Sequence, residues 1–157
     1  MSLVVRPELV VLVGLPGAGK STFYRSYLAR THVLVSKDRF RHNRNRPRRQ
    51  RQLVRAALAC GWSVAVDNTN PGRAERAELL ALAQAFGAGT VAYVFPPDLP
   101  GCLRRNAERS GRERVPERAL YDVLRRFERP EPGEGFARLC KVTLRDDGCF
   151  DVTALAE

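Results

Sequence analysis

Short apolar runs along this chain alternate with longer segments in which apolar residues recur every three or four positions. Residues 9–13 are continuously apolar, which is typical of a central parallel strand covered on both faces. A helix is predicted over 20–30, because Phe23, Tyr27 and Leu28 are spaced to face a sheet. The pattern therefore predicts a strand, a glycine-rich loop and a helix in succession.

The same alternation continues to the last third of the sequence. Pro47 suits the first turn of a helix, and Asn70 is expected to cap a helix that begins at Pro71. Five strands joined by helices predict a single α/β domain over residues 1–157, with an open, five-stranded parallel sheet and ligands at the carboxyl ends of its strands. The other expected strands are 32–36, 63–67, 90–95 and 139–144, and the other expected helices are 47–59, 71–86, 99–109 and 116–128.

Composition narrows the class of protein. The chain has 157 residues, of which 44% are hydrophobic and 28% charged, and these values fit a globular domain. The apolar run at 9–13 is far shorter than the roughly 20 residues that cross a bilayer. A glycine-rich loop follows it where a signal peptide would have its cleavage site. We therefore expect a cytoplasmic protein with no membrane partner.

Charge adds a candidate partner. The net charge is +10, and all but three of the 27 basic residues are arginine. Nine basic residues and a single acid, Asp38, lie between Lys37 and Arg55. A solvated surface, or the codon bias of a GC-rich genome, is one explanation. Attraction of a polyanion such as nucleic acid is the other, and the position of this run beside a candidate catalytic residue favours it.

A phosphate-binding loop is the strongest motif. The segment GLPGAGKS from Gly14 to Ser21 satisfies the pattern G-x-x-x-x-G-K-[ST] in full. Its glycines let backbone amides curl around a phosphate, and the next helix presents its positive end to the same anion. Lys20 is expected to neutralise the β- and γ-phosphates, and the Ser21 hydroxyl to coordinate Mg²⁺. The predicted cofactors are ATP, or another nucleoside triphosphate, and Mg²⁺. The predicted nucleotide-binding residues here are Gly14, Gly17, Ala18, Gly19, Lys20, Ser21 and Thr22.

Three further segments lie where a phosphotransferase needs them. Asp38 follows the second predicted strand, where a carboxylate can take the proton of an attacking hydroxyl, unless it only caps a helix. Asp67 ends the third strand and can bind the metal's water shell or organise the site, unless it is only a cap or turn residue. Residues 104–116 form an arginine-rich connection, here called the lid. It can close over a triphosphate and spread transition-state charge, although a solvated helix end would look similar.

Together these segments resemble the family of 5′-hydroxyl polynucleotide kinases over residues 9–142. The resemblance implies a P-loop kinase fold in which ATP and a nucleic-acid 5′ end enter from opposite sides. It rests on the P-loop, the Asp38/Arg41 pair, the string DNTNP at 67–71, the lid residues Arg105, Asn106 and Arg109, and the segments Phe127-Glu128 and Glu134-Gly135-Phe136.

The resemblance also implies roles for individual residues. Asp38 would be the general base, and Arg41 would hold the phosphate on the 3′ side of the acceptor. The lid is one residue longer than in the relatives, so Arg112 or Arg114 can share the role of Arg109. The implied catalytic residues are Lys20, Asp38 and Arg109; the nucleotide would also contact Arg105 and Arg109; the acceptor would contact Asp38, Arg41, Asp67 and Asn68; Mg²⁺ would be bound by Ser21, with Asp67 acting through water.

Three functions remain open on the sequence. The leading prediction is transfer of the γ-phosphate of ATP to the 5′-hydroxyl end of DNA or RNA. A kinase of a nucleoside or other small metabolite would share the same core, and an ATP-binding regulatory module without phosphoryl transfer would share the loop. The basic charge near Asp38 favours the polymer, and the presence of both Asp38 and a complete lid counts against the regulatory module.

Overall fold

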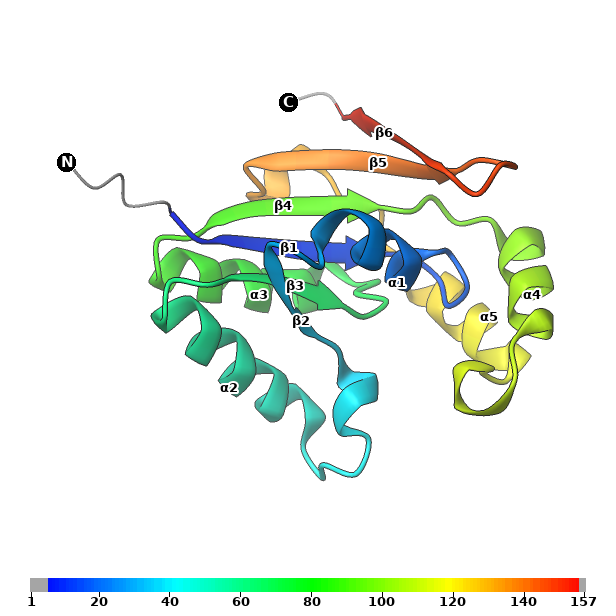
Figure 1. Ribbon diagram of the computed structural model, residues 1–157, viewed down its shortest axis with the longest axis horizontal. Helices are drawn as coiled ribbons and strands as arrows, with labels where there is room; N and C mark the ends of the chain where they lie inside the picture. The colour runs from blue at the N-terminus through cyan, green and yellow to red at the C-terminus, as the bar shows by residue number, and fades with distance from the viewer. Residues whose placement is uncertain (1–5, 156–157) are drawn as a thin grey trace.

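A six-stranded sheet organises residues 6–155, the part of the chain that this computed structural model describes (Figure 1). The strands lie in the order β2-β3-β1-β4-β5-β6. All neighbouring strands are parallel except β5 and β6, which are antiparallel. The strands are β1 (Glu8–Val13), β2 (His32–Val35), β3 (Ser63–Asp67), β4 (Gly89–Val94), β5 (Arg138–Leu144) and β6 (Phe150–Ala154).

Helices cover both faces of this sheet, which explains why β1 is apolar along its whole length. Leu9, Val11 and Val13 pack in one core cluster with residues of α2 (Arg46–Ala59) and α3 (Arg73–Ala85). Val10 and Leu12 pack in a second cluster on the opposite face, together with residues of α1 (Lys20–Phe23), α4 (Leu99–Glu108) and α5 (Glu117–Arg126). In Figure 1, α4 and α5 lie beyond the carboxyl ends of the strands. None of the helices within 6–155 is both long enough and apolar enough to cross a bilayer.

The five predicted strands are all present, and the α/β fold class is confirmed. The sixth strand was not predicted. It follows a tight turn in which Gly148 has φ +84°, and the Arg145 amide donates to the Cys149 carbonyl at 2.8 Å. Asp147-Gly148 is a sequence signal for such a hairpin. The turn brings Phe150 onto Phe23, with ring centroids 5.4 Å apart, and so closes the second core cluster.

Two local predictions were wrong. The helix expected over 20–30 is α-helical only to Phe23 and continues as a π-helical turn, η1 (Tyr24–Leu28). Phe23 and Tyr27 lie together, with ring centroids 4.9 Å apart, and both rings lie against Phe150. Asn70 does not cap α3, which begins at Arg73 after Gly72. Instead its side-chain amide donates to the Leu12 carbonyl at 2.8 Å.

Candidate functional site

The P-loop connects β1 to α1 at the carboxyl edge of the sheet. Gly17 and Gly19 have φ values of +81° and +100°, which only glycine adopts without strain. A Cβ on Gly17 would also lie 2.9 Å from the Cys102 carbonyl oxygen. The Gly14 amide donates to the Thr69 carbonyl at 3.1 Å, so the loop is attached to the string 67–71 that follows β3. The glycines of the motif therefore serve close packing as well as phosphate approach.

Lys20 lies inside the loop and is only 8% exposed. Its Nζ donates to the Gly14 carbonyl at 2.9 Å and to the Leu15 carbonyl at 2.7 Å. Burial lowers the pKa of Lys20 from 10.5 to about 8, and the charge of Arg109 acts in the same direction. The negative charges of Asp67 and Asp38 oppose this shift in pKa. The loop carbonyls thus hold the Lys20 ammonium beside the loop. A phosphate would bind the ammonium more strongly than these carbonyls do, because a hydrogen bond between two charged groups is stronger.

Ser21 and Asp67 make the oxygen-rich part of the site. The Ser21 hydroxyl donates to Asp67 Oδ2 at 2.7 Å, which joins the start of α1 to the end of β3. A hydroxyl and a carboxylate in contact fit Mg²⁺, which prefers oxygen ligands and keeps several waters. This pair would hold the ion, and when bound the ion would neutralise charge on the phosphates. Asp67 is therefore more than a turn residue in this geometry.

The segment after β2 forms a short 3₁₀ helix, η2 (Lys37–Phe40), that carries Asp38. Ser36 caps this helix, because its hydroxyl accepts the Asp38 amide at 3.4 Å. The Asp38 carboxylate is exposed and is not the cap. Residues three apart eclipse one another in a 3₁₀ helix, which places Arg41 beside Asp38. Arg41 Nε donates to the Asp38 carbonyl at 3.3 Å.

Asn68 links the string to this segment. Its Oδ1 accepts the Lys37 amide at 2.9 Å, and its Nδ2 donates to Gln50 Oε1 of α2. The sequence predicts that Asn68 contacts the acceptor. In the structure both ends of its amide group hold neighbouring parts of the protein, so its visible contribution is to fix where η2 begins.

The lid runs from α4 to α5, and hydrogen bonds join its two ends. Asn106 is 1% exposed, and its side chain both accepts the Val115 amide at 3.0 Å and donates to the Val115 carbonyl at 2.8 Å. Arg105 Nε donates to the Gly17 carbonyl at 2.6 Å, which attaches the lid to the P-loop. Sequence reasoning used Asn106 only as part of a motif, and its buried amide gives that motif a physical purpose.

Two lid arginines differ in burial and in their contacts. Arg109 is half-buried, and its charge acts on the pKa of Lys20. Arg112 is exposed, and its carbonyl accepts Arg41 Nη2 at 3.2 Å. The lid therefore touches the P-loop through Arg105 and the segment after β2 through Arg112. Arg114 is exposed too.

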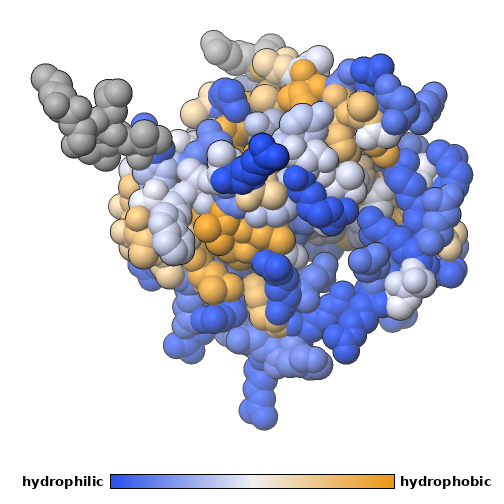
Figure 2. Space-filling model, viewed as in Figure 1, coloured by the Kyte–Doolittle hydropathy of each residue, from blue (hydrophilic) through white to orange (hydrophobic). Residues whose placement is uncertain are grey.

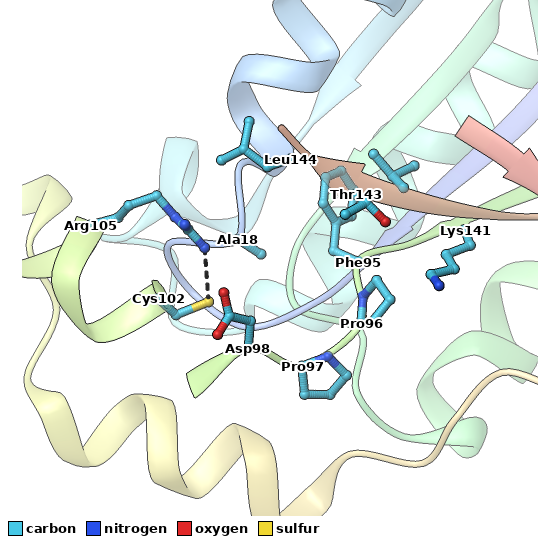
Figure 3. Close-up of a pocket in the computed structure, with 11 residues that line it drawn as sticks. Ala18, Phe95, Pro96, Pro97, Asp98, Cys102, Arg105, Lys141, Thr143 and Leu144 are labelled. Carbon is cyan, nitrogen blue, oxygen red and sulfur yellow. Dashed lines mark hydrogen bonds between the residues drawn. The ribbon is translucent and has the colours of Figure 1, made fainter. Parts of the chain in front are cut away.

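A cavity of about 270 Å³ opens beside the P-loop at the ends of β4 and β5 (Figure 3). In Figure 3 the side chains of Arg105 and Cys102 approach it from α4, and a hydrogen bond of 3.7 Å joins them. Its place next to Ala18 suits the base or ribose of a bound nucleotide. Sequence reasoning missed it, although Pro96-Pro97 directly after a buried strand was an available signal. The lining residues are Ala18, Phe95, Pro96, Pro97, Asp98, Cys102, Arg105, Lys141, Val142, Thr143 and Leu144.

Comparisons with known proteins bear on the family and the fold of this chain. A family model described as an AAA domain (AAA_33) matches residues 9–130. The chain is 25% identical over 137 residues to an L-seryl-tRNA(Sec) kinase of Methanococcus maripaludis, covering 78% of this chain and 53% of that protein. It is 28% identical over 144 residues to a bifunctional polynucleotide phosphatase/kinase of Schizosaccharomyces pombe, covering 88% of this chain and 34% of that protein.

A similar fold is found in Chaetomium thermophilum Kti12, whose crystal structure contains ADP-AlF3. The TM-score is 0.69 at 20% identity, over 88% of this chain and 90% of that chain. The chain spans about half the length of the first of the two curated relatives and about a third of the second. The fold is therefore shared with Kti12, whereas the names of the two curated relatives indicate different acceptors.

Binding of Mg-ATP at pH 8 should be coupled to proton uptake. With its pKa at about 8, half of the Lys20 side chains are neutral at that pH, and the charge of a triphosphate raises the pKa again. We expect uptake of about half a proton per nucleotide at pH 8 and about a tenth at pH 7. Titration calorimetry in buffers of different ionisation enthalpy measures both values. The same binding enthalpy in every buffer at pH 8 would contradict the buried, partly neutral Lys20.

Proposed function

This chain belongs to the AAA domain family (AAA_33), and on that premise we propose that it is a kinase that transfers the γ-phosphate of ATP to the 5′-hydroxyl end of a polynucleotide. The observation that carries the proposal is the placement of Arg41 between Asp38 and the lid. Arg41 contacts the Asp38 carbonyl on one side and the Arg112 carbonyl on the other. A proton acceptor, a phosphate-binding cation and the basic lid are therefore neighbours.

The chemistry follows from the charges that these side chains supply. Lys20 and Arg109 stabilise the negative charge that spreads over the transferring phosphoryl group. Ser21 and Asp67 would hold Mg²⁺, which when bound would supply positive charge to the phosphates. Asp38 accepts the proton of the 5′-hydroxyl. The oxygen of that hydroxyl forms a bond to the γ-phosphorus, while the bond between the γ-phosphorus and the β,γ-bridging oxygen breaks. The products are a 5′-phosphorylated end, ADP and a protonated Asp38.

Arg41 supplies the preference for a polymer. A hydroxyl held at Asp38 leaves the next phosphate of a polynucleotide near Arg41, which can bind two phosphate oxygens with its planar guanidinium. A plain nucleoside or sugar lacks that phosphate. The contact carries no base information, so it positions the acceptor without selecting its sequence.

An arginine stripe continues from this point along α2. Arg48 and Arg55 are exposed, seven residues apart on α2, and Arg44 is exposed just before the helix begins. Of the nine basic residues from Lys37 to Arg55, the described part of the structure pairs only Arg51 with an acid, Glu78, at 3.8 Å. Figure 2 shows hydrophilic side chains over the lid and over the α2 end, on either side of a hollow. Uncompensated charge beside the acceptor side supports a polyanionic substrate.

The test is an assay with γ-labelled ATP, Mg²⁺ and a panel of acceptors. The panel contains 5′-hydroxyl DNA and RNA oligonucleotides, plain nucleosides, sugars and a serylated tRNA, the last because of the similarity to the L-seryl-tRNA(Sec) kinase. We expect label on oligonucleotides and none with the Lys20→Ala variant, which should keep its fold. Label confined to a nucleoside or sugar would identify the protein as a small-metabolite kinase. Label on the serine would identify a tRNA-linked amino acid as the acceptor. Absence of label on every acceptor would favour an ATP-binding regulatory module without phosphoryl transfer.

The variant Asp38→Asn should lower the maximal rate by roughly 10² to 10⁴-fold, the usual loss when a positioned general base is removed. ATP affinity should hardly change, because Asp38 faces the acceptor. Asp146→Asn, on the exposed β5–β6 turn, is the matched control and should keep the wild-type rate. If ATP affinity collapsed while turnover stayed high, Asp38 would belong to the metal site instead.

The variant Arg41→Ala tests the substrate class. It should raise the Michaelis constant for oligonucleotides of any sequence and make that constant less dependent on salt, because one phosphate contact is lost. An acceptor without a 3′ phosphate should be poor for wild type and variant alike. Arg30→Ala, an exposed arginine before β2, serves as the control for charge alone. If the wild type used a nucleoside and an oligonucleotide equally well and Arg41→Ala had no effect, the proposal of a polynucleotide acceptor would be refuted.

A further inference from the structure

Arg76 of α3 is a buried cation outside the groups that act on the phosphates. Its side chain is 0% exposed, and its partner Glu134 is 2% exposed. Nε and Nη2 donate to the two Glu134 carboxylate oxygens at 2.8 and 3.1 Å. Nη1 donates to the Asn70 and Pro71 carbonyls at 3.0 and 2.9 Å, and Nη2 also donates to the Glu128 carbonyl at 2.9 Å. All five N–H groups of the guanidinium are thereby used.

Two of these contacts fall on the end of the string 67–71. Asn70 is in the left-handed region with φ +44°, a conformation that an asparagine tolerates but does not prefer. Arg76 donates to the backbone carbonyl of Asn70. The side-chain amide of Asn70 donates to the Leu12 carbonyl. The Pro71 carbonyl accepts a second donor, the Glu128 amide, at 2.8 Å. The unusual turn at Asn70 is therefore fixed from both sides.

The other end of the same string carries the site. Asp67 accepts the Ser21 hydroxyl, Asn68 accepts the Lys37 amide, and the Thr69 carbonyl accepts the Gly14 amide. A shift of Asn70 would thus reach the P-loop, the metal-binding pair and the start of η2 at once. This also explains the segments Phe127-Glu128 and Glu134-Gly135-Phe136, whose Glu128 and Glu134 supply the partners of Arg76.

From these contacts we infer that Arg76 and Glu134 are positioning residues that set the place of the string 67–71 and, through it, the Mg²⁺ pair and the acceptor turn. The ion pair alone is weak evidence for a stabilising role, since buried ion pairs seldom stabilise a fold more than apolar residues do. Only a planar group with five donors can bind three carbonyls and a carboxylate together. The part of the inference that concerns Asp67 as a metal ligand rests on the proposed function. The part that concerns the backbone position of the string 67–71 does not.

The first experiment measures amide hydrogen exchange by NMR in the nucleotide-free protein. In Arg76→Lys the ammonium can still pair with Glu134 but cannot bind all the carbonyls. We expect the Gly14 and Lys37 amides to exchange about tenfold faster, because local opening of the string exposes them. The amide of Leu155, which donates to Leu139 at the far side of the sheet, should be unchanged.

The second experiment measures the Mg²⁺ concentration for half-maximal phosphoryl transfer, and in parallel the enhancement of ATP binding by Mg²⁺ in calorimetry. Arg76→Lys and Glu134→Gln should raise that concentration roughly tenfold or more, the usual effect of removing a group that orients a metal ligand. Arg126→Lys is the matched control, because Arg126 forms an exposed pair with Glu75 at 3.5 Å. It should change neither quantity.

A purely structural role makes a different forecast. Leu79→Ala removes a buried side chain one turn further along α3 and should destabilise the protein without touching the string. If Leu79→Ala shifts the Gly14 and Lys37 amides and the Mg²⁺ requirement as much as Arg76→Lys does, the inference is overturned. Should Arg76→Lys fail to fold, Glu134→Gln, which preserves the shape of the carboxylate, decides the matter. A wild type that phosphorylates no acceptor refutes the proposed function, while the exchange measurement still judges Arg76.

Discussion

The hydrogen bond from the Gly14 amide to the Thr69 carbonyl joins the two loops on which the site depends. One loop follows β1 and would bind the donor phosphates, and the other follows β3 and presents Asp67 and Asn68. Parallel neighbouring strands end at the same edge of a sheet, so the fold brings these loops close without further design. The bond then holds the two loops in contact with each other, and in this arrangement the Ser21 hydroxyl reaches the Asp67 carboxylate.

The elements that depend on local sequence were predictable, and those that depend on distant partners were not. Apolar runs gave the five parallel strands, and the glycine pattern gave the P-loop, because both signals lie within a few residues. The π-helical turn after Phe23 has no signal in the local pattern, which is that of an ordinary helix, and the contact of Phe23 with Phe150 joins residues far apart in the chain. Asn70 has the chemistry of a helix cap, but its amide reaches Leu12, 58 residues away.

Arginine dominates the charge of this protein, yet composition does not reveal that its arginines occupy three different environments. Arg76 is buried and fully hydrogen-bonded, Arg105 and Arg109 are half-buried in the lid, and Arg48 and Arg55 are exposed on α2. The guanidinium presents the same planar group of five donors in all three. One residue type can therefore support the fold, contact the P-loop and attract a polyanion, and only the three-dimensional structure separates these tasks.

The closed base of the lid has a consequence for how such a protein can diversify. Asn106 binds both polar backbone groups of Val115, so the residues between them form a loop whose ends are fixed to each other. The entropy of closing a loop grows only with the logarithm of its length, and doubling the length adds about 0.6 kcal/mol. Insertions on either side of Arg109, between these two anchors, would therefore cost little stability and would leave Arg105 on the P-loop. Lid length is a feature that evolution, or an engineer, can vary to admit acceptors of different bulk.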